Sequence, residues 1–223
     1  MAGMALVLLI LFIIIMLTGI PVGFGMGALT VISFLMLGGD LSMIPQKLFA
    51  GIDTYTYVCI LLFILSADIM SVGGITKSIV VFCEKVVGHI KGGLAHVNVL
   101  ASMLFAGLSG SAAADAAGLG PIEIEMMNEG GYDKEFSTSV TAASAIIGPI
   151  IPPSNIMIVF AGCVGTVSVG KMFLAGAIPG ILLGAAYMVL CYCISVRENY
   201  PCREKRAPWK EIGKSAVDTL PAL

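Results

Sequence analysis

The chain has 223 residues, of which 58% are hydrophobic and 12% are charged, and its mean hydropathy is +1.00. Soluble globular domains carry roughly 25% charged residues, so this composition excludes an ordinary soluble domain and indicates an integral protein of a lipid bilayer. The formal net charge of −2 argues against a nucleic acid partner. No Lys or Arg precedes Lys47, and six of the twelve lie in the last 27 residues.

Apolar segments make up most of the first third of the chain. Residues 4–17 and 22–37 predict two helices, residues 45–52 a short interfacial piece, and residues 55–72 a third span. A signal peptide is the alternative interpretation of residues 4–17. That segment lacks a basic start and the hydrophobicity resumes directly after it, which favours a retained anchor. The six cysteines form no CxxC pair, so we expect buried free thiols.

Two segments alternate apolar and charged side chains at helical spacing. Residues 75–90 carry Lys77, Glu84 and Lys85 between apolar positions, and residues 209–223 follow the same pattern. Both predict amphipathic helices, the first of them at the membrane interface. Between them, residues 172–196 predict a further spanning helix. The last residues look like the approach to another apolar segment, so we expect the chain to be part of a longer protein.

The long run from residue 92 to residue 122 contains Asp115 as its only charged residue. Its middle, residues 109–115, is small and polar, which favours two half-length helices that meet at a tip over one overlong span. Such a hairpin enters and leaves the membrane on one side.

The distribution of Lys and Arg supports the hairpin over a full crossing. If the hairpin returns to the cytoplasm, the basic residues at 77–91, Lys134 and the basic C-terminal loop all face the cytoplasm, and the N-terminus lies outside. A full crossing would separate the basic residues at 77–91 from the C-terminal loop.

Residues 148–155 break a stretch, residues 136–170, that contains no charged side chain. Pro149, Pro152 and Pro153 each lack an N–H, so carbonyls over residues 145–150 are expected to lose their helical partners. Such groups are tolerated in a bilayer only when they are buried in protein or line a cavity. We therefore expect a broken helix over residues 133–165 that contributes to a transport site, with a simple kink as the alternative.

The tip and the break together offer the oxygen ligands that hard cations such as sodium prefer. Half-helix C-terminal ends favour cations and N-terminal ends favour anions, so one constellation can bind sodium and a carboxylate. We expect this site to use Ser109, Gly110, Ser111, Asp115, Gly148, Pro149, Ser154 and Asn155. As alternatives, Ser109 or Ser111 caps a helix, and Asp115 caps locally or pairs with a basic group.

Enzyme motifs are absent from the sequence. It contains no GxSxG, HExxH, GxGxxG or P-loop pattern, and no partner residues for intramembrane proteolysis. We therefore expect a protein that is not an enzyme and that needs no cofactor other than a coupling ion.

Two motifs together resemble a known family. The run FAGLSGSAAAD at residues 105–115, followed by IIGPIIPPS at residues 146–154, is similar to the large membrane subunit, DctM type, of tripartite ATP-independent periplasmic (TRAP) transporters. Residues 19–24 and 61–67 also resemble that family. The resemblance covers nearly the whole chain.

This resemblance implies sodium-coupled symport of an organic acid, such as a C4-dicarboxylate or sialic acid, across the bacterial inner membrane. It implies an elevator mechanism, with this chain as the N-terminal one of two inverted repeats. The implied partners are a small four-helix membrane subunit (DctQ type), a periplasmic solute-binding protein (DctP type) and the second half of the permease. The implied regions are scaffold-type helices (1–72), an interfacial arm helix (73–91), a transport-type hairpin and broken helix (92–170), a spanning helix (171–197) and a connector (198–223).

One departure from the family pattern is length, since its members are about twice as long. We expect a truncated chain, a fragment or the product of a split gene. Two other functions stay open on the sequence. One is an anion carrier of the wider ion transporter superfamily that needs no binding protein, and the other is a membrane scaffold that transports nothing.

Overall fold

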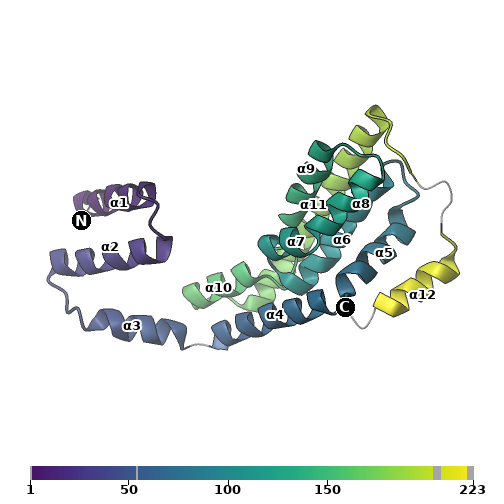
Figure 1. Cartoon of the computed structure of the whole chain (residues 1–223). Helices are drawn as coiled ribbons and strands as arrows, with labels where there is room; N and C mark the ends of the chain where they lie inside the picture. The colour runs from purple at the N-terminus through teal and green to yellow at the C-terminus, as the bar shows by residue number, and fades with distance from the viewer. Residues whose placement is uncertain (1, 54, 203–206, 220–223) are drawn as a thin grey trace. The chain divides into compact units, whose positions relative to one another are not determined.

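The structure is a computed structural model that describes residues 2–53, 55–202 and 207–219 (Figure 1). Helices make up its regular structure and no β-strand occurs in these residues, which confirms the predicted all-α fold. The helices are α1 (Ala2–Leu17), α2 (Val22–Leu37), α3 (Met43–Ile52), α4 (Tyr55–Val72), α5 (Ile75–Val87), α6 (Gly93–Ser109), α7 (Ala112–Gly118), α8 (Gly120–Glu129), α9 (Lys134–Ala145), α10 (Asn155–Val164), α11 (Val169–Arg197) and α12 (Trp209–Thr219). Two parts of the sequence predictions lie outside the described residues. They are three basic residues of the C-terminal loop, at 203, 205 and 206, and the end of the predicted connector, residues 220–223.

The first of two compact units extends to Tyr57. Its helices α1 and α2 lie side by side (Figure 1) and meet at Gly25, where a Cβ would lie only 2.7 Å from Cγ2 of Ile15. Most of the other described side chains of α1 and α2 are apolar and exposed, among them Leu17 and Phe24. An apolar surface of this extent is stable only against lipid or another protein, so this unit has the exterior of a membrane segment.

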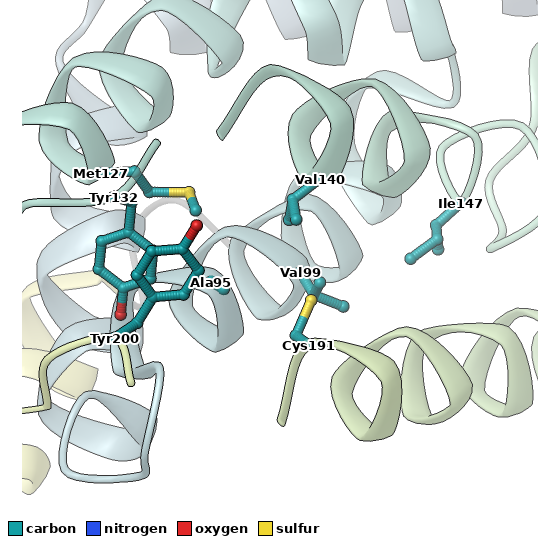
Figure 2. Packing of buried hydrophobic residues seen from close by; sticks show 8 residues of the cluster. All are labelled: Ala95, Val99, Met127, Tyr132, Val140, Ile147, Cys191 and Tyr200. Carbon is teal, nitrogen blue, oxygen red and sulfur yellow. The ribbon is translucent and has the colours of Figure 1, made fainter. Parts of the chain in front are cut away.

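The second unit, which starts at Val58, is organised around α6. This helix packs against α5, α7, α8, α9 and α11. One side of α6 contributes Ala95 and Val99 to a cluster that is completed by Met127, Tyr132, Val140, Ile147, Cys191 and Tyr200 (Figure 2). Another side contributes Val97, Ala101 and Phe105 to a second cluster with α5 and Leu119. Helix α6 is therefore buried nearly all round, as a central helix must be.

Stacked aromatic rings fix the loop that follows α11. Tyr200 stacks on Tyr132 with ring centroids 4.6 Å apart (Figure 2) and on Phe136 at 5.1 Å. The Tyr132 hydroxyl donates to the Pro201 carbonyl at 3.0 Å, and the Tyr200 hydroxyl donates to Oδ2 of Asp133 at 2.6 Å. These contacts join the end of α11 to the turn between α8 and α9.

One described helix, α11, is long and apolar enough to cross a bilayer by itself. A second span arises if α3 and the following part of α4 count as one bent pair. The apolar helices α2, α6 and α10 and most of α1 are shorter. The predicted segments 4–17, 22–37 and 55–72 are therefore helices as expected, while their crossing of a bilayer stays a prediction.

The second arm of the predicted hairpin differs from the prediction. It was expected as one half-helix that ends at residue 122, but α7 ends at Gly118 and a separate helix, α8, continues to Glu129. Pro121 stands in the first turn of α8, where its missing N–H leaves no hydrogen bond unmade. The arm is thus divided at Leu119, whose side chain is fully buried.

The cysteines are free, as predicted, but only Cys83 and Cys191 are buried. The prediction of burial is wrong for Cys59, Cys163, Cys193 and Cys202, which lie on surfaces that this chain leaves uncovered. The apolar runs that carry most of them are outward-facing here, so apolar sequence did not translate into burial within the chain.

Candidate functional site

The hairpin tip is a tight turn between α6 and α7. Gly110 follows the end of α6 in the left-handed conformation, with φ 58° and ψ 19°, which glycine adopts without steric cost. Its N–H donates to the Ala106 carbonyl at 3.0 Å. Ser111 then caps α7, because its Oγ accepts from the N–H of Ala114 at 3.4 Å. The capping role that was left open for Ser111 is therefore present.

The break between α9 and α10 is an irregular turn over residues 146–154. Ser154, whose side chain is fully buried, stabilises it from both sides. The Ser154 hydroxyl donates to the Pro149 carbonyl at 2.6 Å and accepts from the N–H of Met157 at 3.3 Å, so it closes the turn and caps α10.

The predicted loss of carbonyl partners over residues 145–150 was too broad. The Ala145 carbonyl accepts from the N–H of Gly148 at 3.0 Å, and the Ile147 carbonyl accepts from the N–H of Ile150 at 3.0 Å. Short turns therefore satisfy carbonyls that the prolines remove from the helix, and the Ser154 hydroxyl satisfies that of Pro149.

The tip and the break are in direct contact, although more than 30 residues separate them. The Asn155 side-chain amide donates to the Ser109 carbonyl at 3.3 Å, across a sequence separation of 46 residues. A Cβ added to Gly110 would collide with the Pro153 carbonyl and lie 3.2 Å from the Asn155 nitrogen. A Cβ on Gly148 would lie 3.1 Å from the Ser111 carbonyl carbon. Gly110 thus allows a close backbone approach that a side chain would prevent, and a side chain at Gly148 would be tightly packed against the tip.

Seven of the eight predicted site residues are brought together by these contacts: Ser109, Gly110, Ser111, Gly148, Pro149, Ser154 and Asn155. The eighth, Asp115, lies one turn further along α7. Its carboxylate is buried and makes no hydrogen bond, to the tip or to the break. The groups that interact with the Asp115 carboxylate are the Ser102 hydroxyl and the Glu123 carboxylate, and neither residue belongs to the tip.

A buried polar network links α6 to α9 and was not predicted. The Asn98 amide donates to Oγ1 of Thr141 at 2.7 Å and accepts from the Ser144 hydroxyl at 2.7 Å. The Ser102 hydroxyl in turn lies 3.1 Å from that of Ser144. Asn98 with Ser102 and Thr141 with Ser144 stand four and three residues apart, which places each pair on one helix face, and this spacing is the signal that could have revealed the network.

Helix ends give the site its electrostatic character. The C-termini of α6 and α9 carry partial negative charge, and the N-terminus of α10 carries partial positive charge. These ends meet where the tip contacts the break. The described residues contain no group of three or more His, Cys, Asp or Glu side chains that could hold a metal ion.

Comparison with known proteins identifies the family of the chain. Residues 9–223 match the protein family described as "Tripartite ATP-independent periplasmic transporter, DctM component". The chain belongs to this DctM family. The family consists of membrane transport components, so the chain is a membrane protein and not an enzyme.

Several DctM-family relatives are similar along most of the chain. The sialic acid TRAP transporter large permease protein SiaM of Vibrio cholerae is 41% identical over 91% of this chain and 48% of the relative. The sialic acid TRAP transporter permease protein SiaT of Haemophilus influenzae is 41% identical over 96% of this chain and 35% of the relative. The C4-dicarboxylate TRAP transporter large permease protein DctM of Vibrio cholerae is 39% identical over 96% of this chain and 48% of the relative. The chain therefore spans about half the length, or less, of these relatives.

Proposed function

We propose that the chain is the N-terminal half of a TRAP large permease that couples sodium entry to the uptake of an organic acid across the bacterial inner membrane. The single observation that carries this proposal is the contact of the hairpin tip with the helix break through Asn155 and Ser109. Non-helical backbone at membrane depth is stable only in such a buried or cavity-lining setting.

The sodium ion is proposed to bind between the C-terminal ends of α6 and α9. Ser109, Ser111, Gly148 and Ser154 supply hydroxyl and carbonyl oxygens there, and both helix ends favour a cation. Asp115 was predicted as a ligand of this site, but its carboxylate makes no hydrogen bond to the tip or the break, so the proposed site does not use it.

The substrate is proposed to be a carboxylate-containing acid that approaches the N-terminus of α10. The helix dipole at that end favours an anion, and Asn155 stands at its first position. The relatives' names give sialic acid, C4-dicarboxylates and 2,3-diketo-L-gulonate as substrates, all of which are organic acids. That shared class supports the assignment.

The remaining parts of the proposal follow from membership of the DctM family. The hairpin of α6 and α7 is proposed to be re-entrant, and the chain is proposed to form one of two inverted repeats in an elevator-type permease. Its partners would be a small four-helix membrane subunit, a periplasmic solute-binding protein and the second half of the permease. The basic loop after α11 would face the cytoplasm and the N-terminus the periplasm.

Uptake measurements on the full-length permease and its partners in proteoliposomes test the proposal. Replacing both Ser109→Ala and Ser154→Ala removes two hydroxyls of the site. We expect the sodium concentration for half-maximal uptake to rise by ~10-fold or more, in line with ligand-shell substitutions at metal sites.

Ser139→Ala is the matched control, because the Ser139 hydroxyl bonds to the Glu135 carbonyl on the exposed side of α9. It should leave the sodium dependence unchanged. Unaltered sodium dependence in the double variant, with the protein folded and inserted, would overturn the proposed site.

A further inference from the structure

Two carboxylates behind the hairpin tip are buried without partners. Asp115 in α7 is 1% exposed and Glu123 in α8 is 0% exposed. None of their four carboxylate oxygens has a hydrogen-bond partner in the part of the chain that the structure describes. Buried polar groups are normally paired, and an unpaired buried carboxylate costs several kcal/mol.

No positive side chain of the described residues acts on this pair. The groups that act electrostatically on Asp115 and Glu123 are the Ser102 hydroxyl and the two carboxylates themselves, with the Cys83 thiol next to Glu123. Among the described residues, neither acid therefore has a Lys, Arg or His as a counter-charge. Two like charges in one buried place raise the cost further.

The position of the pair connects it to both halves of the proposed site. The N–H of Asp115 donates to the Ser111 carbonyl at 3.0 Å, which is part of the tip. Ser102 lies 3.1 Å from Ser144 on α9, the helix that leads into the break. Asp115 is thus bonded to the tip through its backbone, and Ser102, which acts on its carboxylate, belongs to the α6–α9 network.

We propose that Asp115, Glu123 and Ser102 form a second cation site, which takes a small hard metal cation such as sodium. Carboxylate and hydroxyl oxygens are the ligands that such cations prefer. A bound cation supplies the counter-charge that the described residues do not. The inference goes beyond the proposed function, because the contact of tip and break neither includes nor requires Glu123.

Cation-dependent thermal stability of the purified full-length permease tests this site without relying on transport. Apparent Tm is measured in sodium chloride, in magnesium chloride and in choline chloride at equal ionic strength. A cation that binds only the folded protein raises its Tm by mass action. Sodium and magnesium distinguish a monovalent from a divalent occupant of the same site.

Glu123→Gln keeps the shape of the side chain and removes its charge. We expect its Tm in choline chloride to equal or exceed that of the wild type, since an uncompensated buried charge has gone. Its affinity for the stabilising cation should fall by ~10-fold or more. Asp115→Asn should have the same effect from the neighbouring helix, and it tests the site if Glu123→Gln does not purify.

Glu125→Gln is the control, because Glu125 is exposed on the same helix. It should leave the cation response unchanged. An equal cation response in the wild type, Glu123→Gln and Asp115→Asn would overturn the second site. Failure of the tip and break site would instead leave the response of the Ser109→Ala and Ser154→Ala double variant at wild-type level, so the two failures are distinguishable.

Discussion

Helices α2 and α6 have similarly apolar sequences but satisfy their polar side chains in opposite ways. In α2, the Thr30 and Ser33 hydroxyls donate to carbonyls of the preceding turn, at 2.8 and 2.7 Å. In α6, Asn98 and Ser102 bond to side chains of α9. A hydroxyl that bonds to its own helix needs no neighbour, whereas Asn98 needs α9 in place.

The two helices also differ in burial. Gly25 is the buried residue in the described part of α2, while α6 is buried on nearly every side. The comparison teaches that hydrophobicity alone does not separate an outward-facing helix from a central one in a membrane protein. Polar side chains that require a partner on another helix do separate them.

The largest difference in mutational effect between the two regions is expected for two matched glycines, one after each helix. Gly110 and Gly38 both follow a helix in the left-handed conformation, with φ 58° and 66°. A methyl group on Gly110 collides with the Pro153 carbonyl, whereas one on Gly38 meets nothing within 4 Å. Backbone strain costs about 1–2 kcal/mol at either position, and the collision adds to it only at Gly110.

Gly110→Ala should therefore abolish most sodium-dependent uptake by the full-length permease and lower its Tm more than Gly38→Ala does. Gly38→Ala should be inserted and active, with a modest loss of stability. Equal activity of the two variants would show that the contact of tip and break does not matter for transport.

A smaller difference is expected for two matched serines. Ser144→Ala removes the donor to Asn98 and leaves buried polar groups without partners, at an expected cost of about 1–2 kcal/mol. Ser33→Ala removes a bond to its own helix and should change the free energy of unfolding by less than about 0.5 kcal/mol. Thermal unfolding of the two variants in the same detergent measures both. Equal losses would contradict the distinction drawn between α2 and α6.

The smallest effect is expected at the aromatic stack. Tyr200→Phe keeps the rings and deletes the hydrogen bond to Asp133, which should cost about 1 kcal/mol. Burial and the nearby Asp133 carboxylate raise the pKa of Tyr200 to about 12. Because this pKa lies above the ordinary value of about 10, the stabilisation is complete below pH 10 and is lost as the pH rises toward 12. Titration of Tm from pH 8 upward should show a smaller loss in Tyr200→Phe than in the wild type, because Tyr132, whose pKa burial also raises to about 12, is still present in the variant.

The helices and the two irregular turns could be predicted from the sequence. Pro149, Pro152 and Pro153 cannot continue a helix, and the polar run 109–115 cannot sit in one lipid-facing span, so the turns follow from local chemistry. Charge spacing likewise marks α5 and α12. These features depend on residues that are neighbours in the sequence, which is why the sequence predicts them.

The contacts between distant segments could not be predicted in the same way. Nothing near Asn155 in the sequence indicates that its amide donates to Ser109, since that bond depends on the packing of α6 against α9. The sequence likewise does not indicate that Glu123 is buried, because its burial depends on how α8 packs in the folded chain.

The central claim is that the hairpin tip and the helix break bind sodium together. High-resolution structures of the full-length permease in sodium and in choline test it most directly. We predict density for a cation in sodium only, coordinated by oxygens of residues 109–111 and 148–154. Sodium-dependent uptake without density for a cation at the hairpin tip and the helix break would contradict the account.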